Sequence, residues 1–471
     1  MGARYIRQFT NLEKPKGILN RVTTRDYPLH FLDERKEKSI MSIIDAKHES
    51  LSRPEIRQLQ LERLQAMLNR VVRNVSYYQN SFKEANILPT DIRSLSDLAK
   101  IPLLNREILK ENQPYNMFAV PLREVVRLHP SRSGLADPIV IGHTKNDIMV
   151  WTHLKARSFA AADITQNDMV QVYLDYTLFP GAVVAHYGAE QLGACVTPLY
   201  SIPIAKQLEI MRNYRTTVLI CTPTRALHII RYMRENNIDP KSLFLRTVVL
   251  VGESWSNRTH RQIEENLFVD VYGNYGVSEI CIPGIAYECE VHSGLHICED
   301  HFIAEIIDPK TGETLHPDQR GELVLTTLTK EAFPLIRFRT GDITTLNDDE
   351  CPCGRTFLRM ENVTRRADNM LIVEGVEFLP SEIGTILTNI EHVTANYRLI
   401  IQSEGIRDRL EVEVEMTPDI FIDQLGPLEA LREQIEEDIF DRLRIKPIIK
   451  LVEPQSLEGQ DKVVDMRETE R

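Results

Sequence analysis

Four side chains with the chemistry of metal ligands stand in two short segments of the chain. Cys289 and His296 lie in "ECEVHSGLH", and Cys351 and Cys353 lie one residue apart in "ECPCGR", where a proline and a glycine predict a tight turn. Together they can supply four tetrahedral ligands to zinc, and such a site would be structural because no coordination position stays open. The alternative is four unligated side chains on a β-rich surface. Three nearby residues are alternatives to His296: His292, Cys298 and His301.

The segment "VYGNYGVSEI", 271–280, carries groups suited to a nucleotide. The glycine of Tyr275-Gly276 lets the backbone approach a flat ring closely. Ser278 adds a hydroxyl, and the carboxylate of Glu279 is the kind of oxygen ligand that Mg²⁺ takes beside phosphates. Tyr-Gly turns are common and most exposed glutamates bind nothing, so this segment needs support from others.

Two further segments carry charged residues at the ends of strand-like runs. Asp342 ends "PLIRFRTGD", and a carboxylate there can accept both hydroxyls of a ribose. The alternative is a salt-bridged strand end. Arg366 and Asp368 flank one alanine just before a new strand-like run, and hinges often consist of a few residues at the ends of elements.

The pattern of elements predicts how these groups are positioned. Strand-like and helical runs alternate between residues 169 and 267, which predicts βαβ units and a parallel sheet, hence an α/β fold. Strand-like runs predominate after Gly294. From Arg365 the order of strand-like and helical runs predicts a small α+β domain of about 100 residues. We therefore expect an N-terminal extension over 1–45, a large domain over 46–364 and a small mobile domain over 365–471.

Composition excludes several classes of protein. The formal net charge of −12 over 471 residues argues against a general nucleic-acid binder. The sequence contains no run of about 18 apolar residues, so no membrane span is predicted. The N-terminal residues do not resemble a secretory signal. A cytoplasmic protein is therefore expected. Seven cysteines are an odd number and do not suggest a disulfide framework. Cys195 and Cys221 lie in apolar runs and are predicted to be core residues.

Three longer phrases connect these segments to a known family. "GELVLTTLTKEAFPLIRFRTGDI", "CPCGRTF" and "GLHICEDHFIAEIIDPKTGE" resemble the phenylacetate–CoA ligase branch of the adenylate-forming superfamily, and the likeness extends over about residues 45–465. The resemblance implies a large domain that binds ATP and an aromatic carboxylate. It also implies a small domain that rotates between adenylation and thioester formation with CoA.

The resemblance further implies roles for individual residues. Some members of this branch carry zinc at the four Cys/His positions described above. The stretch that contains Tyr173, Tyr176 and Phe179 is implied to line the acid pocket. Glu279 takes the Mg²⁺ position, Arg366 lies by the ribose or phosphates, and Asp368 is the hinge. The implied nucleotide-binding residues are Gly252, Glu253, Ser254, Tyr275, Gly276, Ser278, Asp342 and Arg366.

The chain departs from the family at the phosphate loop. Where the family reads roughly Ser-Ser-Gly-Thr-Thr-Gly-Lys-Pro, residues 131–138 read Ser131, Arg132, Ser133, Gly134, Leu135, Ala136, Asp137 and Pro138. Such loops aim backbone N–H groups and hydroxyls at phosphate oxygens. An aspartate at the lysine position repels a triphosphate, so the loop is predicted to be degenerate. The alternative is a compensating charge from Arg132.

A second departure lies near the C-terminus. The lysine that reaches the carboxylate and the α-phosphate in the family is replaced by Gln460 in "SLEGQDKVVDMR", and Lys462 is a candidate substitute two places on. Losing both the loop and this lysine removes most of the electrostatic stabilisation of the adenylation transition state. Binding of ATP and Mg²⁺ is therefore expected to be weak or absent.

These observations leave three functional hypotheses. The favoured one is a phenylacetate–CoA ligase-like protein with lost or impaired adenylation, which handles an acyl or aryl acid or its thioester with CoA or a phosphopantetheine carrier. The second is an active ATP-dependent aryl-acid–CoA ligase, supported by Glu279, Asp342 and Arg366. The third is a non-catalytic scaffold or chaperone for an acyl carrier protein or its modifying enzyme. A homodimer is left open.

Overall fold

The computed structural model describes most of the chain from residue 43 onward. Residues 1–42 of the expected N-terminal extension lie outside this description, as do the loop 132–138 and several shorter stretches. The described ranges are 43–131, 139–176, 180–200, 202–363, 365–367, 370–373, 376–404, 407–417, 425–457 and 462–466. In this part of the chain no helix combines the length and hydropathy needed to cross a bilayer.

The described chain begins with helices whose sequence explains them. Helix α1 spans Ala46–Glu49, and α2 spans Arg53–Asn74. Ser52 and Glu55 form a capping box at the start of α2, in which the Ser52 N–H donates to Glu55 Oε2 at 2.9 Å. Apolar residues at helical spacing on α2 face the core. The next three α-helices are α3 Ser76–Glu84, α4 Arg106–Glu111 and α5 Lys145–Ala161.

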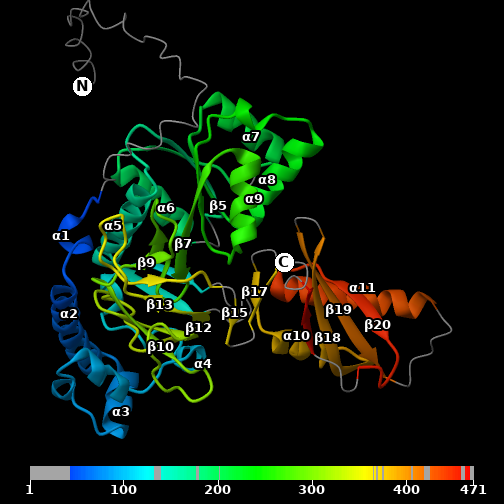
Figure 1. Ribbon diagram of the computed structural model, residues 1–471. Coiled ribbons are helices and arrows are strands. Elements are labelled where there is room, and N and C mark those ends of the chain that lie inside the picture. The colour runs from blue at the N-terminus through cyan, green and yellow to red at the C-terminus, as the bar shows by residue number, and fades with distance from the viewer. Residues whose placement is uncertain are drawn as a thin grey trace, which may run out of the picture. The chain divides into compact units, whose positions relative to one another are not determined.

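A nine-stranded sheet forms the centre of the described large domain, in the order β13-β14-β9-β8-β7-β6-β5-β3-β4. Its parallel strands alternate along the chain with helices, as the sequence predicted (Figure 1). The parallel strands are β3 Met169–Tyr173, β4 Cys195–Pro198, β5 Val218–Cys221, β6 Thr247–Leu250 and β7 Asp270–Val277. The helices between them are α6 Pro180–Gln191, α7 Ile204–Asn213, α8 Pro223–Glu235 and α9 Asn257–Leu267.

The remaining strands of the sheet are antiparallel and carry the cysteine segments. Strand β8 spans Cys281–Glu288, β9 Leu295–Ile297, β13 Leu346–Asn347 and β14 Arg359–Met360. Strand β9 pairs with both β8 and β14. This pairing brings the segment around Cys289 beside the segment around Cys351, although about 60 residues separate them in sequence.

A second, antiparallel sheet follows the order β10-β11-β12-β15. Its strands are β10 Phe302–Ile307, β11 Gly321–Thr327, β12 Phe338–Thr344 and β15 Arg365–Arg366. Asp342 of β12 lies directly opposite Arg366 of β15. A separate hairpin of β1 Val125–Pro130 and β2 Val140–Thr144 flanks the loop 132–138.

The C-terminal residues form a mixed sheet with its own apolar cluster. The order is β20-β19-β18-β21, with β18 Val393–Glu404, β19 Arg407–Met416, β20 Ile448–Val452 and β21 Val463–Asp465. The hairpin β16 Leu371–Val373 and β17 Val376–Phe378 precedes it, with helices α10 Pro380–Leu387 and α11 Leu425–Leu443. One apolar stripe of α11, which includes Ile435 and Ile439, is buried. The α/β fold with an α+β C-terminal part is confirmed, whereas the boundary at residue 365 stays a prediction.

One prediction about the core is wrong. Cys221 is buried in the central strand β5, but Cys195 is exposed. Cys195 belongs to β4, which is the last strand of the sheet, so this residue lacks the second neighbouring strand that covers Cys221. An apolar run therefore predicted the strand correctly without revealing its place at the edge of the sheet.

Candidate nucleotide pocket and metal centre

A pocket opens beyond the carboxyl end of β6 and along the last residues of β7, near the edge where open parallel sheets usually bind ligands. Seven of the eight residues expected around the nucleotide line it. Ser278, which the structure also describes, is not among the lining residues and is 6% exposed. The lining residues are Gly252, Glu253, Ser254, Trp255, Asn274, Tyr275, Gly276, Leu295, Asp342, Met360, Asn362, Val363 and Arg366.

The loop after β6 is fixed by contacts that its sequence motif does not reveal. Gly252 has φ of +79°, a conformation that side chains with a Cβ rarely adopt. The Glu253 carboxylate accepts from Thr224 N–H at 3.0 Å and from Thr224 Oγ1 at 2.7 Å, so it caps the start of α8. The Trp255 ring lies so close to Gly273 that a Cβ there would be 1.9 Å from it. The pocket wall therefore depends on a glycine at 273.

Asp342 lines the pocket together with two residues that bind its carboxylate. Tyr275 Oη donates to Asp342 Oδ2 at 2.5 Å, and Arg366 Nη1 donates to Oδ1 at 2.5 Å. Arg366 Nη2 also donates to the Thr340 carbonyl at 2.9 Å. Burial and the neighbouring Asp342 raise the pKa of Tyr275 well above its ordinary value, so the phenol stays protonated and donates. The carboxylate predicted for ribose thus accepts from two protein groups in this structure.

Glu279, the predicted Mg²⁺ ligand, is buried and paired with an arginine. Its side chain is 1% exposed, and Arg106 Nε donates to Glu279 Oε1 at 2.9 Å. Arg106 Nη1 also reaches the Thr340 carbonyl at 3.0 Å. Nothing in "NREILKEN" pointed to this role, because Arg106 lies 173 residues from its partner. A divalent cation at Glu279 would have to accommodate a guanidinium beside it.

Five of the predicted site residues lie outside the described residues: Arg132, Ser133 and Gly134 of the loop, the hinge Asp368, and Gln460. The loop's ends are described. Ser131 Oγ accepts from the Ile139 N–H at 3.0 Å, and the Ser131 N–H donates to the Ile139 carbonyl at 2.8 Å. Lys462 places its ammonium 4.3 Å from the centre of the Tyr397 ring, a cation–π contact.

A buried basic cluster lies at the hairpin that flanks the loop, and no local motif pointed to it. His143 Nε2 lies 2.9 Å from His129 Nδ1, and Lys330 Nζ lies 2.7 Å from His143 Nδ1. Trp151 stacks on His143 with ring centres 5.1 Å apart. Burial lowers the pKa of His129 to about 3 and that of His143 well below its ordinary value, so both rings are neutral near pH 7.

The four predicted zinc ligands converge. One ligand atom from each lies within 4.8 Å of the others, and all four side chains are buried: Cys289, His296, Cys351 and Cys353. Cys289 Sγ lies 3.8 Å from Cys351 Sγ, and Cys353 Sγ lies 3.4 Å from His296 Nε2. Bonds of about 2.3 Å to sulfur and 2.0 Å to nitrogen around a tetrahedral ion give such separations. His296 Nδ1 donates to the Phe357 carbonyl at 3.3 Å, which fixes its tautomer.

Of the three alternatives to His296, none joins this group. His292 lies with His260 and Glu288, and His301 hydrogen bonds Thr329 through Nδ1 at 2.7 Å. Cys298 is buried apart from the other three thiols. The ligand set Cys289, His296, Cys351 and Cys353 therefore fits zinc best on geometry as well as on residue type.

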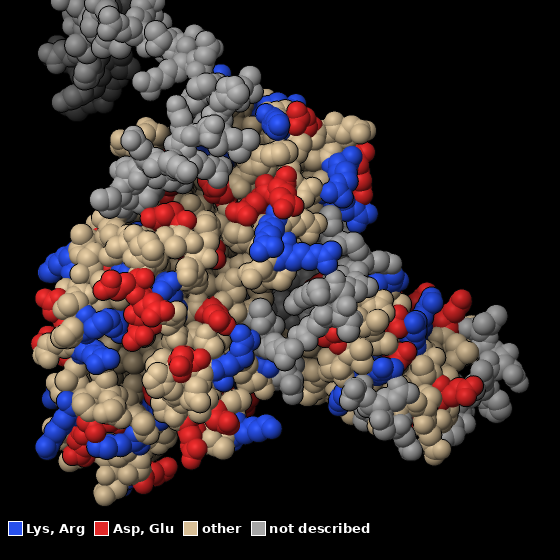
Figure 2. Space-filling model, viewed as in Figure 1, with Lys and Arg blue, Asp and Glu red and all other residues tan. Residues whose placement is uncertain are grey.

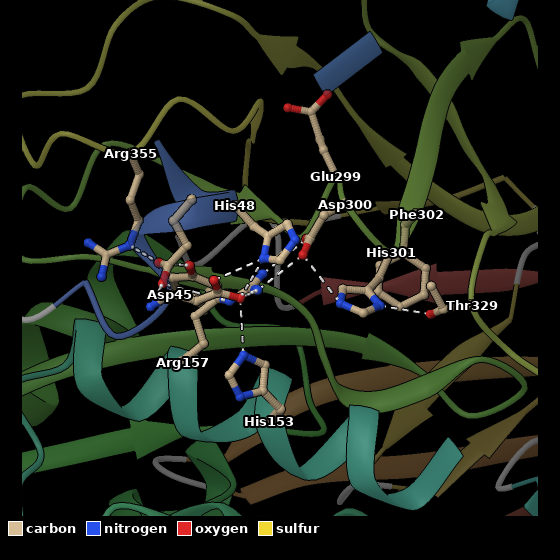
Figure 3. Close-up of polar contacts among 12 residues, drawn as sticks. Asp45, His48, His153, Arg157, Glu299, Asp300, His301, Phe302, Thr329 and Arg355 are labelled. Carbon is tan, nitrogen blue, oxygen red and sulfur yellow. Dashed lines mark hydrogen bonds and ion pairs between the residues drawn. The ribbon is translucent and has the colours of Figure 1, made fainter. Parts of the chain in front are cut away.

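An ion-pair network next to this centre was not expected from the sequence (Figure 3). Arg157 is fully buried, and its guanidinium lies 2.6 Å from Asp45 Oδ2 and 3.0 Å from Asp300 Oδ1. Arg355, two residues after Cys353, donates to Glu49 Oε2 at 2.7 Å. The network links α1 to α5 and to the cysteine turn. Because Arg157 already neutralises these carboxylates, the Asp45–His48–Asp300 group is not a good metal site.

The stretch implied to line the acid pocket is partly described. Tyr173 ends β3, and Arg225 lies 4.7 Å from its ring centre and 4.3 Å from that of Tyr200. Tyr176 Oη lies 3.3 Å from His186 Nδ1, whereas Phe179 is outside the described residues.

On the face shown in Figure 2, basic and acidic side chains are interspersed over the described surface.

Comparison with known proteins agrees with this geometry. Residues 149–328 match the family described as AMP-binding enzyme, and residues 375–467 match the AMP-binding enzyme C-terminal domain. The chain is 37% identical to phenylacetate-coenzyme A ligase of Thermus thermophilus, over 86% of this chain and 94% of that protein. It is 41% identical to phenylacetate-coenzyme A ligase of Pseudomonas putida, over 78% and 83% respectively.

Solved structures agree on the fold. A crystal structure of 2-hydroxyisobutyryl-CoA ligase, in complex with 2-HIB-AMP and CoA in the thioesterification state, matches with a TM-score of 0.85 at 25% identity. It covers 92% of this chain and 94% of the ligase. The sequence identities extend over most of this chain and of its relatives. The chain therefore belongs to the phenylacetate–CoA ligase family of adenylate-forming enzymes.

Proposed function

We propose that this CoA ligase-like protein handles an acyl or aryl acid as its thioester and that its own adenylation step is lost or strongly impaired. The observation that carries the proposal is a contrast between the described pocket and the residue types at two positions outside the described residues. Residues expected around the nucleoside converge on one pocket, with Tyr275, Asp342 and Arg366 in contact. The two positions expected to bring lysines to the phosphates hold Asp137 and Gln460.

The size of the expected loss follows from the charge that develops during adenylation. Removing one well-placed electrostatic contact costs about 3 kcal/mol, or roughly a hundredfold or more in rate. Asp137 adds a negative charge where a lysine is expected, and Gln460 offers no charge. The two losses act on the same phosphates and need not add, but either one is enough to make exchange slow.

The assay is carboxylate-dependent exchange of labelled pyrophosphate into ATP, over a panel of aryl and fatty acids. We expect little exchange from the natural chain but measurable AMP binding at the pocket around Asp342. The matched control carries Gln460→Lys together with a loop restored to the family pattern over 131–138. Rapid exchange by the natural chain with any acid would show that it is an active ligase.

Acyl transfer without ATP is the remaining chemistry that the proposal predicts. A preformed acyl thioester is offered, with CoA or a phosphopantetheine-bearing carrier protein as the acceptor. Transfer to either acceptor in the absence of ATP supports the proposal and identifies the partner. A chain that binds the carrier but neither exchanges pyrophosphate nor transfers the acyl group would instead be a scaffold.

An active ligase is the second candidate, and one observation favours it. The cluster of His129, His143 and Lys330 lies at the hairpin that flanks the loop. Both rings are neutral near pH 7 without a ligand, but an anion close to them would favour their protonated forms and that of Lys330. If they replace the missing lysine, Lys330→Met will abolish exchange in the natural chain. If adenylation is impaired, the natural chain already shows little exchange, and Lys330→Met should leave that low rate unchanged.

We further propose a structural zinc at Cys289, His296, Cys351 and Cys353. The support is the convergence of four buried side chains at separations that suit tetrahedral ligation. When bound, zinc would cross-link the turn after β8 to the turn of residues 351–354. Arg355 follows this turn and binds Glu49, so the ion would also stabilise the attachment of α1.

A further inference from the structure

A second group of metal-ligating side chains lies beside the cysteine centre. It consists of His260 in α9, Glu288 at the end of β8 and His292 in the following turn. We propose that these three residues form a binding site for a divalent transition-metal ion, separate from the four-ligand cysteine centre. Imidazole nitrogens combined with one carboxylate suit zinc, cobalt or nickel better than magnesium or calcium.

The distances among the three residues suit a shared ion. One ligand atom from each lies within 4.8 Å of the other two. His260 Nε2 is 3.7 Å from Glu288 Oε2, which is longer than a hydrogen bond. Two ligands that each lie about 2.0–2.2 Å from one ion are separated by roughly this distance. The rings of His260 and His292 meet edge to face with centres 5.6 Å apart.

Each ligand is held by a contact of its own. His260 Nδ1 lies 3.5 Å from Glu264 Oε2, which leaves Nε2 for a metal. Glu288 Oε2 accepts from the Gly273 N–H at 2.5 Å. Metal ligands in proteins are commonly oriented by such outer contacts. His260 and Glu288 therefore do not depend on the metal for their positions.

His292 is held in an unusual backbone conformation. Its φ is +50°, a left-handed value that is uncommon for residues other than glycine. The His292 N–H donates to the Cys289 carbonyl at 3.0 Å, and its ring lies against Tyr272 with centres 4.9 Å apart. Strained residues of this kind cluster at ligand-binding sites. This turn directs one histidine toward His260 and leaves Cys289 and His296 to the other centre.

Burial gives a further argument for a bound cation. His260 Nε2 is buried and has no hydrogen-bond partner among the described residues. A buried polar atom without a hydrogen bond is costly in free energy, and in native proteins a bound ion can satisfy such an atom. Glu288 is 5% exposed, whereas His292 is exposed. Three protein ligands and access to solvent leave a coordination position for water, unlike the cysteine centre.

The competing interpretation is a simple ion pair between protonated His260 and Glu288. The two interpretations differ in what His292 contributes, because an ion pair does not need it. They also differ in the number of metal ions that each chain binds. Glu288 and Cys289 are adjacent in sequence, so an experiment must distinguish ions at the two centres.

Cobalt distinguishes them, because only a thiolate-ligated ion gives an intense sulfur-to-cobalt charge-transfer band. Full-length protein stripped with a chelator is titrated with CoCl₂ and followed by absorption and calorimetry. We expect two ions per chain, of which one produces the charge-transfer band and the other does not. Zinc added afterwards should displace both.

Variants test the assignment. His292→Ala and His260→Ala should each weaken the second ion at least tenfold and leave the charge-transfer band unchanged. Glu288→Gln keeps an acceptor for Gly273 and should also weaken it. His316→Ala, at a histidine that is 74% exposed, is the matched control. The intact band reports that each variant is folded. The proposal would be overturned if every ion bound by the natural protein produced the charge-transfer band, or if the ion that does not produce the band were unaffected by His292→Ala.

Discussion

Tyr275 and Arg366 bind opposite oxygens of the Asp342 carboxylate, each at 2.5 Å. The two donors come from different strands, β7 and β15, and meet on a residue of β12. A ribose that uses both carboxylate oxygens must therefore compete with or displace these donors. Arg366 lies at the predicted domain boundary, so nucleotide binding and the position of this segment are expected to be coupled.

The first prediction concerns AMP binding at this carboxylate. Asp342→Asn should weaken AMP binding by about ten- to a hundredfold, because hydrogen bonds to a charged group contribute about 1.5–3 kcal/mol. Tyr275→Phe keeps the ring and removes the competing hydroxyl, so binding should be unchanged or tighter. Calorimetric titration measures both. Equal weakening in the two variants would show that the Tyr275 hydroxyl itself contacts the nucleotide.

The parts of this site that could be predicted are those encoded in short contiguous segments. Gly252, Tyr275 and Asp342 stand in local motifs, and the strands that carry them follow from alternating runs of apolar residues. The cysteine centre was also predicted, because residue type and spacing restrict a metal site strongly.

Groups that act through long-range contacts could not be predicted in this way. Arg106 meets Glu279 across 173 residues, and Lys330 meets His143 across 187. Nothing local distinguishes such an arginine or lysine from one on a solvated surface. The exposed Cys195 shows the same limit, since strand order decides which apolar residue is covered.

The second prediction concerns zinc. Purified protein should retain about one zinc per chain after dialysis, held by the cysteine centre. The double variant Cys351→Ser, Cys353→Ser should lose it, as judged by metal analysis. Cys221→Ser, at a buried cysteine of β5, is the matched control for a lost thiol. Unchanged zinc content in the double variant would exclude these ligands.

The third prediction uses the network around Arg157. Arg157→Met leaves Asp300, which is 1% exposed, without its guanidinium partner. Breaking a buried ion pair from one side typically costs about 3–5 kcal/mol. Arg231→Met removes an exposed pair with Glu235 at 2.6 Å and should cost less than about 1 kcal/mol. Urea unfolding compares the two, and similar small losses would show that the Arg157 network does not stabilise the fold.

The fourth prediction tests the boundary at residue 365. The apolar residues from Val373 to Ile449 form a cluster of their own. We expect limited proteolysis near 365–375 to release a C-terminal fragment of roughly 100 residues. Addition of AMP should slow the cleavage, because Arg366 contacts Asp342. A chain with no preferred cleavage in this interval would contradict the boundary.

The fifth prediction concerns acid stability. The pKa of His129 is lowered by burial to about 3, with Lys330 and Arg127 adding to the effect, whereas an unfolded histidine has a pKa of 6.5. Between these values the unfolded chain binds more protons than the folded one. The stabilising contribution is therefore fully present above about pH 6.5 and is lost as the pH falls toward 3. Each histidine of this kind should lower the free energy of unfolding by about 2 kcal/mol as the pH falls from 7 to 5.

This pH window separates the effect of the histidines from that of partly buried carboxylates such as Asp45. Burial acts to raise the pKa of Asp45, but His48, His153 and Arg157 lower it to about 2. Its contribution to stability is present above about pH 4 and is lost only below that value.

His129→Phe keeps an aromatic ring against His143 and removes one titrating group. The unfolding free energy of this variant should fall less steeply between pH 7 and pH 5 than that of the natural protein. His316→Phe, at an exposed position, should follow the natural curve. Parallel curves for His129→Phe and the natural protein would show that His129 is not held neutral in the folded state.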